Sequence, residues 1–227
     1  YLTNDYVALE NSFSGVSKSN GLKYSLVRFS NSNDIFGYVR YVAPNSNAST
    51  TIIERGDLFL TVDGTQMNIN NYQSLLAQDD YTLGLATVAN NTVSSTGESV
   101  ALTKEEGFSE NPILIAKTLE IDGQKIGYLM YNSYVGAYDD ELNAAFADFK
   151  ADGITDLVLD LRYNGGGSVA SAIDLTSMIT GQFEGEVITK QQWNAEAQAY
   201  FESQSPESLI DRFDGQIRTE EPINSLN

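Results

Sequence analysis

The sequence predicts a mixed α/β protein, with a β-rich module in its first half and a partial α/β domain with βαβ units in its second half. Three observations lead to this prediction. Short aromatic or β-branched runs separated by turn signals fill residues 18–105, as expected for strands. A helical pattern at 139–150 precedes an apolar run at 157–159 that is typical of a buried parallel strand. A second helical pattern then follows three consecutive glycines.

The composition of the 227-residue chain excludes several classes of function. It contains 31 acidic and 13 basic residues, which gives a formal net charge of −18. Such an acidic surface repels phosphate backbones, so we expect no nucleic acid as a partner. Because the chain has neither cysteine nor histidine, it cannot complete a Ser-His-Asp triad, a Cys-His dyad or a structural zinc site. We therefore expect no metal and no cofactor, and no apolar run approaches the ~18 residues of a membrane span.

Short strands joined by tight turns are expected in the first half of the chain. Residues 1–17 form a polar and aromatic N-terminal segment to which no element is assigned. Asp63 and Gly64 are a strong signal for a two-residue turn between paired strands. In order, we expect strands at 22–29, 36–42, 57–62, 65–69, 81–88 and 99–103, and helices at 48–54 and 72–77.

The second half is expected to contain a hairpin followed by alternating helices and strands. Asp122 and Gly123 form a turn signal between two apolar runs. Leu142, Phe146 and Phe149 recur at helical spacing. This order of elements predicts right-handed βαβ crossovers. We expect strands at 112–121, 125–131, 157–159 and 187–189, and helices at 139–150, 168–180 and 193–201.

The strongest local signal is the run of Gly165, Gly166 and Gly167 between the apolar strand and the next helix. Glycines let backbone N–H groups converge on one point, and a helix N-terminus adds a positive dipole. Such a turn suits a bound phosphate or a transient oxyanion. The alternative is a plain glycine turn with Ser168 as the N-cap of the helix. A dinucleotide fingerprint also fits residues 165–170, but the nearby acidic residues precede the next strand instead of ending it.

The polar residues around this turn leave the reaction open. Asp160 and Arg162 could orient a catalytic loop or form a structural ion pair. Ser168 and Ser171 are poor candidates for a nucleophile, because neither lies in a G-x-S-x-G motif and no histidine can activate them. The acidic run at 139–141 could bind a cation, but a helix N-terminus also favours negative charge there.

Two blocks of the sequence occur in an order that is typical of one protein family. Residues 127–134 read Gly-Tyr-Leu-Met-Tyr-Asn-Ser-Tyr, and residues 156–167 read Asp-Leu-Val-Leu-Asp-Leu-Arg-Tyr-Asn-Gly-Gly-Gly. These segments resemble a hairpin strand and a Gly-rich turn of the S41 peptidases, the carboxyl-terminal processing or tail-specific proteases. Upstream, residues 21–24, 42–46 and 54–64 resemble the PDZ domain that these enzymes carry.

The resemblance implies a serine endopeptidase that uses a Ser-Lys dyad on a polypeptide substrate. A lysine can act as the base where burial lowers its pKa, which suits a chain without histidine. The family's nucleophile lies in a later Ser-Ala-Ser segment that is absent here, and no lysine follows Lys190. We therefore expect an N-terminal portion of an enzyme that is exported to the periplasm or cell envelope, and we expect this portion to be inactive alone. The implied segments are an N-terminal stretch at 1–17, a PDZ-like domain at 18–105 and a partial S41-type catalytic domain at 106–227.

Two sets of site residues follow from the same resemblance. The Gly165–Gly167 turn would supply one oxyanion donor. A second set in the PDZ-like domain would hold an unstructured or C-terminal peptide by strand addition. Backbone N–H groups near Gly21 and Leu22 would bind the carboxylate of the peptide. This set consists of Gly21, Leu22, Lys23 and Tyr24. Lys23 stands where the family has a small glycine.

Two other functions remain open at this point. The chain could be a non-catalytic module that binds peptides through a PDZ domain on an α/β platform. It could also be a nucleotide-binding α/β domain that uses Gly165–Gly167. Peptide binding, nucleotide binding and the sequence that follows Asn227 would distinguish these alternatives.

Overall fold

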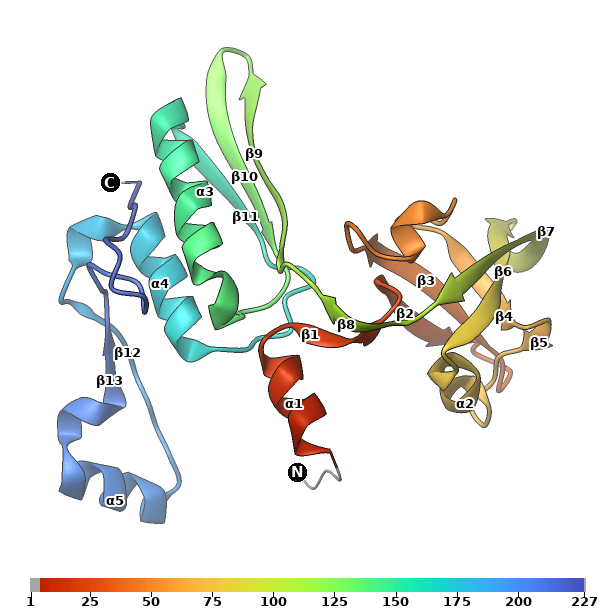
Figure 1. Cartoon of the computed structure of the whole chain (residues 1–227), viewed down its shortest axis with the longest axis horizontal. Helices are drawn as coiled ribbons and strands as arrows, with labels where there is room; N and C mark the ends of the chain where they lie inside the picture. The colour runs from red at the N-terminus through yellow and green to blue at the C-terminus, as the bar shows by residue number, and fades with distance from the viewer. Residues whose placement is uncertain (1–4, 227) are drawn as a thin grey trace. The chain divides into compact units, whose positions relative to one another are not determined.

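The computed structural model describes residues 5–226 and divides the chain into two compact units, Tyr1–Asn111 and Pro112–Asn227 (Figure 1). Each unit has its own hydrophobic core. Helices and strands are present in both units, so the predicted mixed α/β fold class is confirmed.

The first unit is built on an antiparallel sheet with the strand order β2-β3-β4-β6-β7, and β5 pairs with β4. Side chains alternate strictly between buried and half-buried along β3, which is the pattern of a strand with one face on the core. A separate ribbon pairs β1 with β8. The elements are α1 (Tyr6–Phe13), β1 (Val16–Ser19), β2 (Leu22–Arg28), β3 (Ile35–Val42), β4 (Leu58–Val62), β5 (Thr65–Gln66), α2 (Tyr72–Ala77), β6 (Asp80–Ala89), β7 (Thr92–Thr103) and β8 (Glu105–Ser109).

The core of the first unit is centred on Phe59, which is fully buried on β4. Gly37 on β3 lies directly against the Phe59 ring, so a side chain at this position would overlap the ring. Tyr24 of β2 packs edge-on against the same ring, with 5.6 Å between the ring centroids. Val62 and Leu83 are also fully buried, and together these residues join the neighbouring strands of the sheet.

The predicted strands and the helix at 72–77 are present in the first unit, but the helix expected at 48–54 is wrong. Only one 3-10 turn, Ala48–Thr50, forms there. The Thr50 and Thr51 hydroxyls donate to the carbonyl oxygens of Asn47 and Ala48 at 2.8 Å each. Such local bonds compete with the helical pattern.

Three elements of the first unit were not predicted at all: α1, β1 and β8. The two strands pair across about ninety residues of sequence, with Val16 opposite Ser109. A pairing of this kind depends on tertiary contacts, and no local sequence pattern specifies it.

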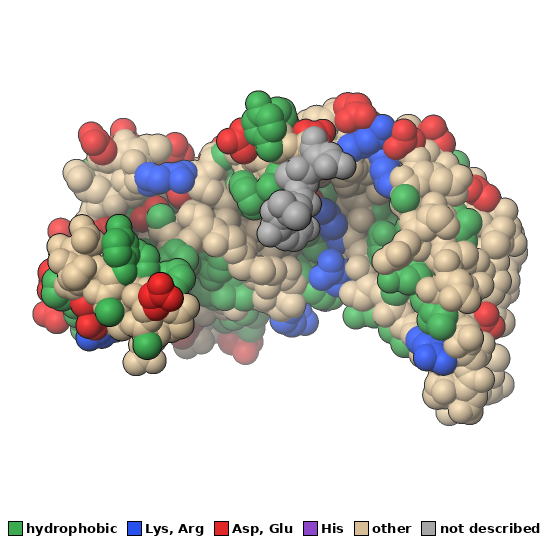
Figure 2. All heavy atoms as spheres, turned by 90° about the horizontal axis from the view of Figure 1, so that it is seen from below, with side chains coloured by type: hydrophobic (Ala, Val, Ile, Leu, Met, Phe, Trp, Pro, Cys, Tyr) green, Lys and Arg blue, Asp and Glu red, His purple; other side chains and the backbone are tan. Residues whose placement is uncertain are grey.

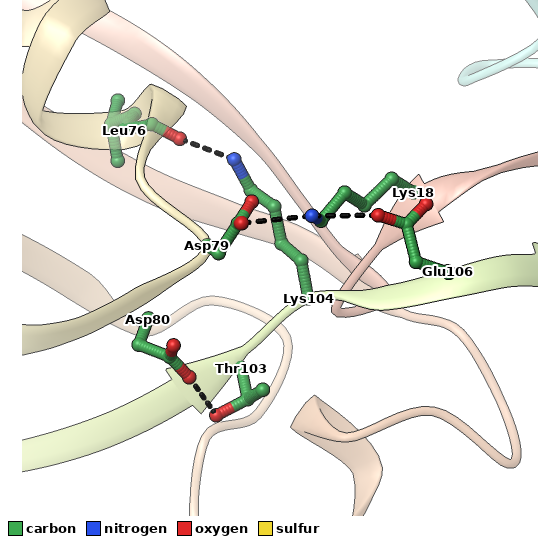
Figure 3. A network of polar contacts seen from close by, with 7 residues as sticks. All are labelled: Lys18, Leu76, Asp79, Asp80, Thr103, Lys104 and Glu106. Carbon is green, nitrogen blue, oxygen red and sulfur yellow. Dashed lines mark hydrogen bonds and ion pairs between the residues drawn. The ribbon is translucent and has the colours of Figure 1, made fainter. Parts of the chain in front are cut away.

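A network of charged side chains ties the β1–β8 ribbon to the end of α2 (Figure 3). The Lys18 ammonium lies 2.8 Å from Asp79 and 2.7 Å from Glu106. Hydrogen bonds to these carboxylates raise the pKa of Lys18. Lys104 donates to the carbonyl oxygen of Leu76 at 2.8 Å, which satisfies one of the open carbonyl groups at the end of the helix.

The second unit contains a sheet with the strand order β11-β10-β9. β9 and β10 form the predicted antiparallel hairpin, and β11 runs parallel to β10 after the crossover helix α3. The predicted βαβ unit is therefore present for β10, α3 and β11. The elements are β9 (Ile113–Ile121), β10 (Gln124–Tyr131), α3 (Asp139–Asp152), β11 (Asp156–Asp160), α4 (Val169–Ile179), β12 (Val187–Lys190), α5 (Ala195–Gln204) and β13 (Ile210–Arg212), with short 3-10 turns at Gly136–Tyr138, Gly181–Phe183 and Pro206–Leu209.

The second expected crossover, through α4 to a further parallel strand, is wrong. β12 pairs antiparallel with β13 in a ribbon of its own. Its side chains are mostly exposed, and Val187 is 49% exposed. A strand with so little apolar surface to bury gains nothing from a place inside a parallel sheet, where both faces are covered.

The core of the second unit lies between the sheet and the helices α3 and α4. Leu142, Phe146 and Phe149 of α3 are buried, as their helical spacing predicted. They pack with Leu129 of β10 and Met178 of α4 in one cluster. Leu159 of β11 and Leu175 of α4 belong to the same cluster, and the Gly-rich segment connects these two elements.

The surface is strongly acidic, as the net charge of −18 requires. Figure 2 shows acidic side chains at many points of the face that it presents, and basic side chains at fewer. Among residues 5–226, no helix combines the length and the apolar character that a bilayer crossing demands.

Candidate functional site

The Gly165–Gly167 turn lies between the end of β11 and the N-terminus of α4. Ser168 is the N-cap of α4, and its hydroxyl oxygen accepts the Ser171 amide at 3.2 Å. The first peptide groups of α4 thus begin directly after the turn. Their partial positive charge favours an anion at this end of the helix.

Two of the three glycines adopt a conformation that other residues rarely adopt. The φ angles are +97° at Gly166 and +137° at Gly167, whereas Gly165 has no positive φ. A Cβ atom on Gly167 would overlap the carbonyl oxygen of Tyr134. Gly167 is therefore required both by its dihedral angle and by the close approach of another segment.

The three backbone N–H groups of the turn do not converge on one point. Gly165 N–H donates to Asn132 O at a long 3.4 Å. Gly166 N–H donates to the Asn164 side-chain oxygen at 2.8 Å. Gly167 N–H, in contrast, has no hydrogen-bond acceptor within the described part of the chain. The turn thus offers one free amide, at its last glycine.

The direction of this free amide follows from the opposite end of its peptide group. Gly166 O accepts Tyr134 N–H at 2.9 Å and the Ser133 hydroxyl at 3.2 Å. In a trans peptide the C=O and N–H bonds point in opposite directions. Gly167 N–H therefore points away from residues 133 and 134 and is available to an external acceptor.

The strand that leads into the turn ends in a closely bonded charged group. Asp160 is buried, and its carboxylate accepts hydrogen bonds from Arg162 Nε at 2.9 Å, Arg162 Nη2 at 2.6 Å and the Tyr128 hydroxyl at 2.7 Å. Hydrogen bonds from Arg162 hold the pKa of Asp160 well below its usual range. The hydrogen bond to Asp160 raises the pKa of the Tyr128 hydroxyl. The expected ion pair is present, and it anchors the start of the turn to β10.

Two buried carboxylates, Asp139 of α3 and Asp174 of α4, lie close enough to interact electrostatically and are 1% and 3% exposed. Asp139 is the first residue of α3 and lies 3.4 Å from the Arg218 guanidinium. One oxygen of Asp174 has no donor among residues 5–226. Burial and the charge of Asp139 raise the pKa of Asp174 to about 6.

Sequence reasoning missed this buried pair. Asp139 belongs to an acidic run that we interpreted as the charged start of a helix. The one available signal was Asp174, an acidic residue inside the apolar helical pattern of α4. Asp174 also borders a cavity of about 650 Å³, together with Asp214 and Glu184. Nowhere in residues 5–226 do acidic side chains form a group that could hold a metal ion.

The predicted peptide-binding residues lie at the start of β2 in the first unit. Gly21 N–H donates to Ser19 Oγ at 3.0 Å, and Leu22 N–H donates to Asn20 Oδ1 at 3.1 Å. Both amides that were expected to take a carboxylate therefore already have acceptors within the chain.

The two side chains that follow are also engaged. The Lys23 ammonium lies 2.6 Å from the Glu110 carboxylate. Tyr24 is half-buried against Phe59, and burial raises its pKa to about 12. A carboxylate at this loop would thus find neither a free amide nor an unpaired Lys23.

Comparisons with known proteins show what the chain is similar to. Residues 125–226 match the family model for peptidase family S41. A Bacteroides fragilis NCTC 9343 protein described as an S41 protease has a TM-score of 0.63 at 22% identity, over 94% of this chain and 61% of that one. The photosystem II D1 C-terminal processing protease has a TM-score of 0.48 at 22% identity, over 74% of this chain and 45% of that one. None of the curated proteins matches the chain.

The match confirms the resemblance to S41 peptidases for residues 125–226. The likeness to the Bacteroides structure shows a shared fold across most of the chain, which spans 61% of that protein's length.

Proposed function

Because residues 125–226 match peptidase family S41, we propose that the chain is part of a serine endopeptidase of the tail-specific, carboxyl-terminal processing type. Its substrate is a polypeptide. The observation that carries the proposal beyond the family match is the free Gly167 amide at the N-terminus of α4.

The Gly165–Gly167 turn supplies one oxyanion donor in this proposal. Attack on a peptide carbonyl turns its oxygen into an oxyanion, and a fixed N–H group that faces this oxygen stabilises the transition state. Gly167 N–H is suited to the role because it is unbonded and its peptide group is held by Tyr134 and Ser133. The positive end of the α4 dipole adds to the same effect.

The nucleophilic serine and the lysine base are expected from polypeptide that follows Asn227. Ser168 is the N-cap of α4, and Ser171 is fully buried, so neither is placed to attack a substrate. Lys18 forms ion pairs with Asp79 and Glu106 that raise its pKa and favour its charged form, whereas a base must be neutral. Lys23 is held in an ion pair with Glu110.

The test is cleavage of an unstructured protein such as β-casein by the complete gene product and by residues 1–227 alone. We expect cleavage by the complete protein and none by the shorter chain. Gly167→Ala should abolish cleavage by the complete protein, whereas Ser168→Ala should retain it. A complete protein that leaves casein intact would refute the peptidase proposal and favour a non-catalytic peptide-binding module.

Residues 18–105 are proposed to be a PDZ-like module that binds peptides by strand addition. β2 is an end strand and pairs only with β3 within the described residues. Phe29 N–H donates to Asp34 O, so by alternation the backbone groups of Tyr24, Leu26 and Arg28 face the open edge. An added strand would bind there.

The occupied amides of Gly21 and Leu22 favour an extended internal segment as the ligand of this module. The test uses a pool of random decapeptides made in two forms, with a free carboxylate and with a C-terminal amide. We expect binding that is the same for both forms. Binding of the free acids alone would show carboxylate capture, and the absence of binding in either form would refute the module.

The same proposal assigns the enzyme to the periplasm or cell envelope. It rests on the family resemblance, and cell fractionation of the complete gene product tests it. Recovery in the cytoplasmic fraction would contradict it.

A further inference from the structure

We propose that Asn164 is a positioning residue that leaves Gly167 N–H as the single free donor of the turn. The catalytic meaning of this inference rests on the proposed peptidase function, but the hydrogen-bond arrangement can be tested separately. Asn164 lies directly before the three glycines and was given no role by the sequence analysis.

The Asn164 side chain connects the turn to the end of β10. Its Nδ2 donates to Tyr131 O at 3.0 Å, and its Oδ1 accepts Gly166 N–H at 2.8 Å. Its backbone N–H donates to Leu161 O at 3.0 Å. One partner is a carbonyl and the other is an N–H group, and the amide side chain satisfies both because it carries a donor and an acceptor.

This connection matters because sterics do not restrain the first part of the turn. A Cβ atom on Gly165 or Gly166 would find no heavy atom within 4 Å. Gly167, in contrast, is held directly against Tyr134. The peptide group between Gly165 and Gly166 therefore depends on hydrogen bonds for its orientation.

Of the two hydrogen bonds near that peptide group, the one to Asn164 is the shorter. Gly165 N–H reaches Asn132 O only at 3.4 Å, which is beyond the usual range for N–H···O bonds. Gly166 N–H reaches Asn164 Oδ1 at 2.8 Å. Asn164 is thus the main restraint on the direction of Gly166 N–H.

Loss of this restraint would change the surroundings of the oxyanion. Rotation of the Gly165–Gly166 peptide group would exchange the directions of Gly165 C=O and Gly166 N–H. Such a rotation, in the peptide group directly before the one that carries Gly167 N–H, would disturb the orientation of the free donor. The neutral Asn164 side chain prevents this without adding a charge of its own.

The first experiment measures amide hydrogen exchange by NMR in the 227-residue chain. In the wild type, Gly166 N–H should exchange slowly and Gly167 N–H quickly, because only the former is bonded. Asn164→Ala should raise the Gly166 exchange rate at least tenfold and shift the Gly167 amide resonance. Asn164→Asp keeps an acceptor for Gly166 N–H but loses the donor to Tyr131 O, so its Gly166 exchange rate should lie between those of the wild type and Asn164→Ala.

The matched control is Asn194→Ala. Asn194 caps α5 by accepting Ala197 N–H at 3.0 Å, which is the same kind of bond at a distant place in the chain. This variant should leave both glycine amides unchanged, so an effect confined to Asn164→Ala cannot arise from general loss of stability. Equal exchange of Gly166 in the wild type and in Asn164→Ala, or a protected Gly167 amide, would overturn the inference.

The second experiment uses the complete gene product with casein as substrate. Asn164→Ala should lower kcat tenfold or more with little change in KM, because orientation of the donor acts on the transition state. Asn194→Ala should retain the wild-type kcat. A complete protein without activity would refute the peptidase proposal while the exchange result stands. An active protein with an unchanged kcat in Asn164→Ala would refute the inference alone.

Discussion

Tyr134 and Gly167 lie side by side in parallel register, as an isolated bridge between the segment after β10 and the Gly-rich turn. Tyr134 N–H donates to Gly166 O at 2.9 Å, and Tyr134 O accepts Ser168 N–H at 2.8 Å. The first bond holds the peptide group that carries the free amide, and the second holds the peptide group that follows it. The close approach they create is possible only because Gly167 has no side chain.

Gly167→Ala is expected to lower the free energy of unfolding of the second unit by about 1–3 kcal/mol, since it adds strain at φ +137° and an overlap with Tyr134 O. Gly165→Ala is the matched control, because its φ is not positive and the space around it is open. The control should change the free energy of unfolding by less than about 1 kcal/mol. Urea denaturation followed by circular dichroism measures both variants. Equal effects would contradict the close approach.

Asp174→Asn is expected to stabilise the second unit above pH 6. Burial, together with the charge of Asp139, raises the pKa of Asp174 to about 6, whereas an aspartate in the unfolded chain titrates near about 4. Between these values the folded protein binds more protons than the unfolded chain, so stability falls as pH rises.

This pH dependence should be reduced in Asp174→Asn and retained in the control Asp148→Asn, which changes an exposed carboxylate on α3. Thermal unfolding from pH 4 to pH 8 measures the effect. A wild-type slope that persists unchanged in Asp174→Asn would mean that another group is responsible.

Asp160→Asn is expected to destabilise the turn and the end of β11. The substitution removes a buried carboxylate that accepts three side-chain hydrogen bonds from Arg162 and Tyr128, at a cost of about 1–3 kcal/mol at neutral pH. Because the pKa of Asp160 is lowered, its stabilising effect is present above about pH 4 and is lost as the pH falls further.

The variant should accordingly start from a lower stability at pH 7 and lose less stability than the wild type as the pH falls below about 4. Asp156→Asn, at the exposed start of the same strand, should behave like the wild type. If Asp160→Asn has the wild-type stability at pH 7, the hydrogen bonds that Asp160 accepts from Arg162 and Tyr128 do not contribute to the stability of the fold.

Asn20→Ala is expected to destabilise the first unit. Asn20 is buried, donates to Tyr81 OH at 2.8 Å and accepts Leu22 N–H at 3.1 Å. Truncation leaves the buried hydroxyl and amide without these partners, at a cost of about 1–3 kcal/mol. The exposed Asn70→Ala serves as control and should change little. A cost below 0.5 kcal/mol for Asn20→Ala, roughly the effect of an ordinary surface change, would contradict this role.

Local signals predicted the elements that depend on a few adjacent residues. Both Asp-Gly turns were predicted, and Asp63, Gly64, Asp122 and Gly123 all adopt the positive φ angles that such turns require. The helix α3 followed from the spacing of its buried apolar residues. These elements could be predicted because the residues that determine them lie within one or two turns of chain.

Pairings between distant segments could not be predicted in this way. β12 was expected to extend the parallel sheet, yet it pairs with β13, and β1 pairs with β8. The position of Asp174 beside Asp139 likewise depends on how α3 and α4 pack. No local pattern encodes such partners, since several arrangements satisfy the same propensities.

The sequence alone therefore determined that a glycine turn follows an apolar strand, that no histidine within these 227 residues can take part in catalysis and that the chain resembles S41 peptidases. The burial expected for that strand is wrong, because Val158 is 47% exposed. The tertiary structure decided which of the three glycine amides stays free. The physical reason is that backbone conformation depends on the glycines themselves, whereas the acceptors of their N–H groups come from side chains and carbonyls that only packing brings near. Asn132 and Tyr134 lie some thirty residues before the turn, and their contacts with it exist only in the folded chain.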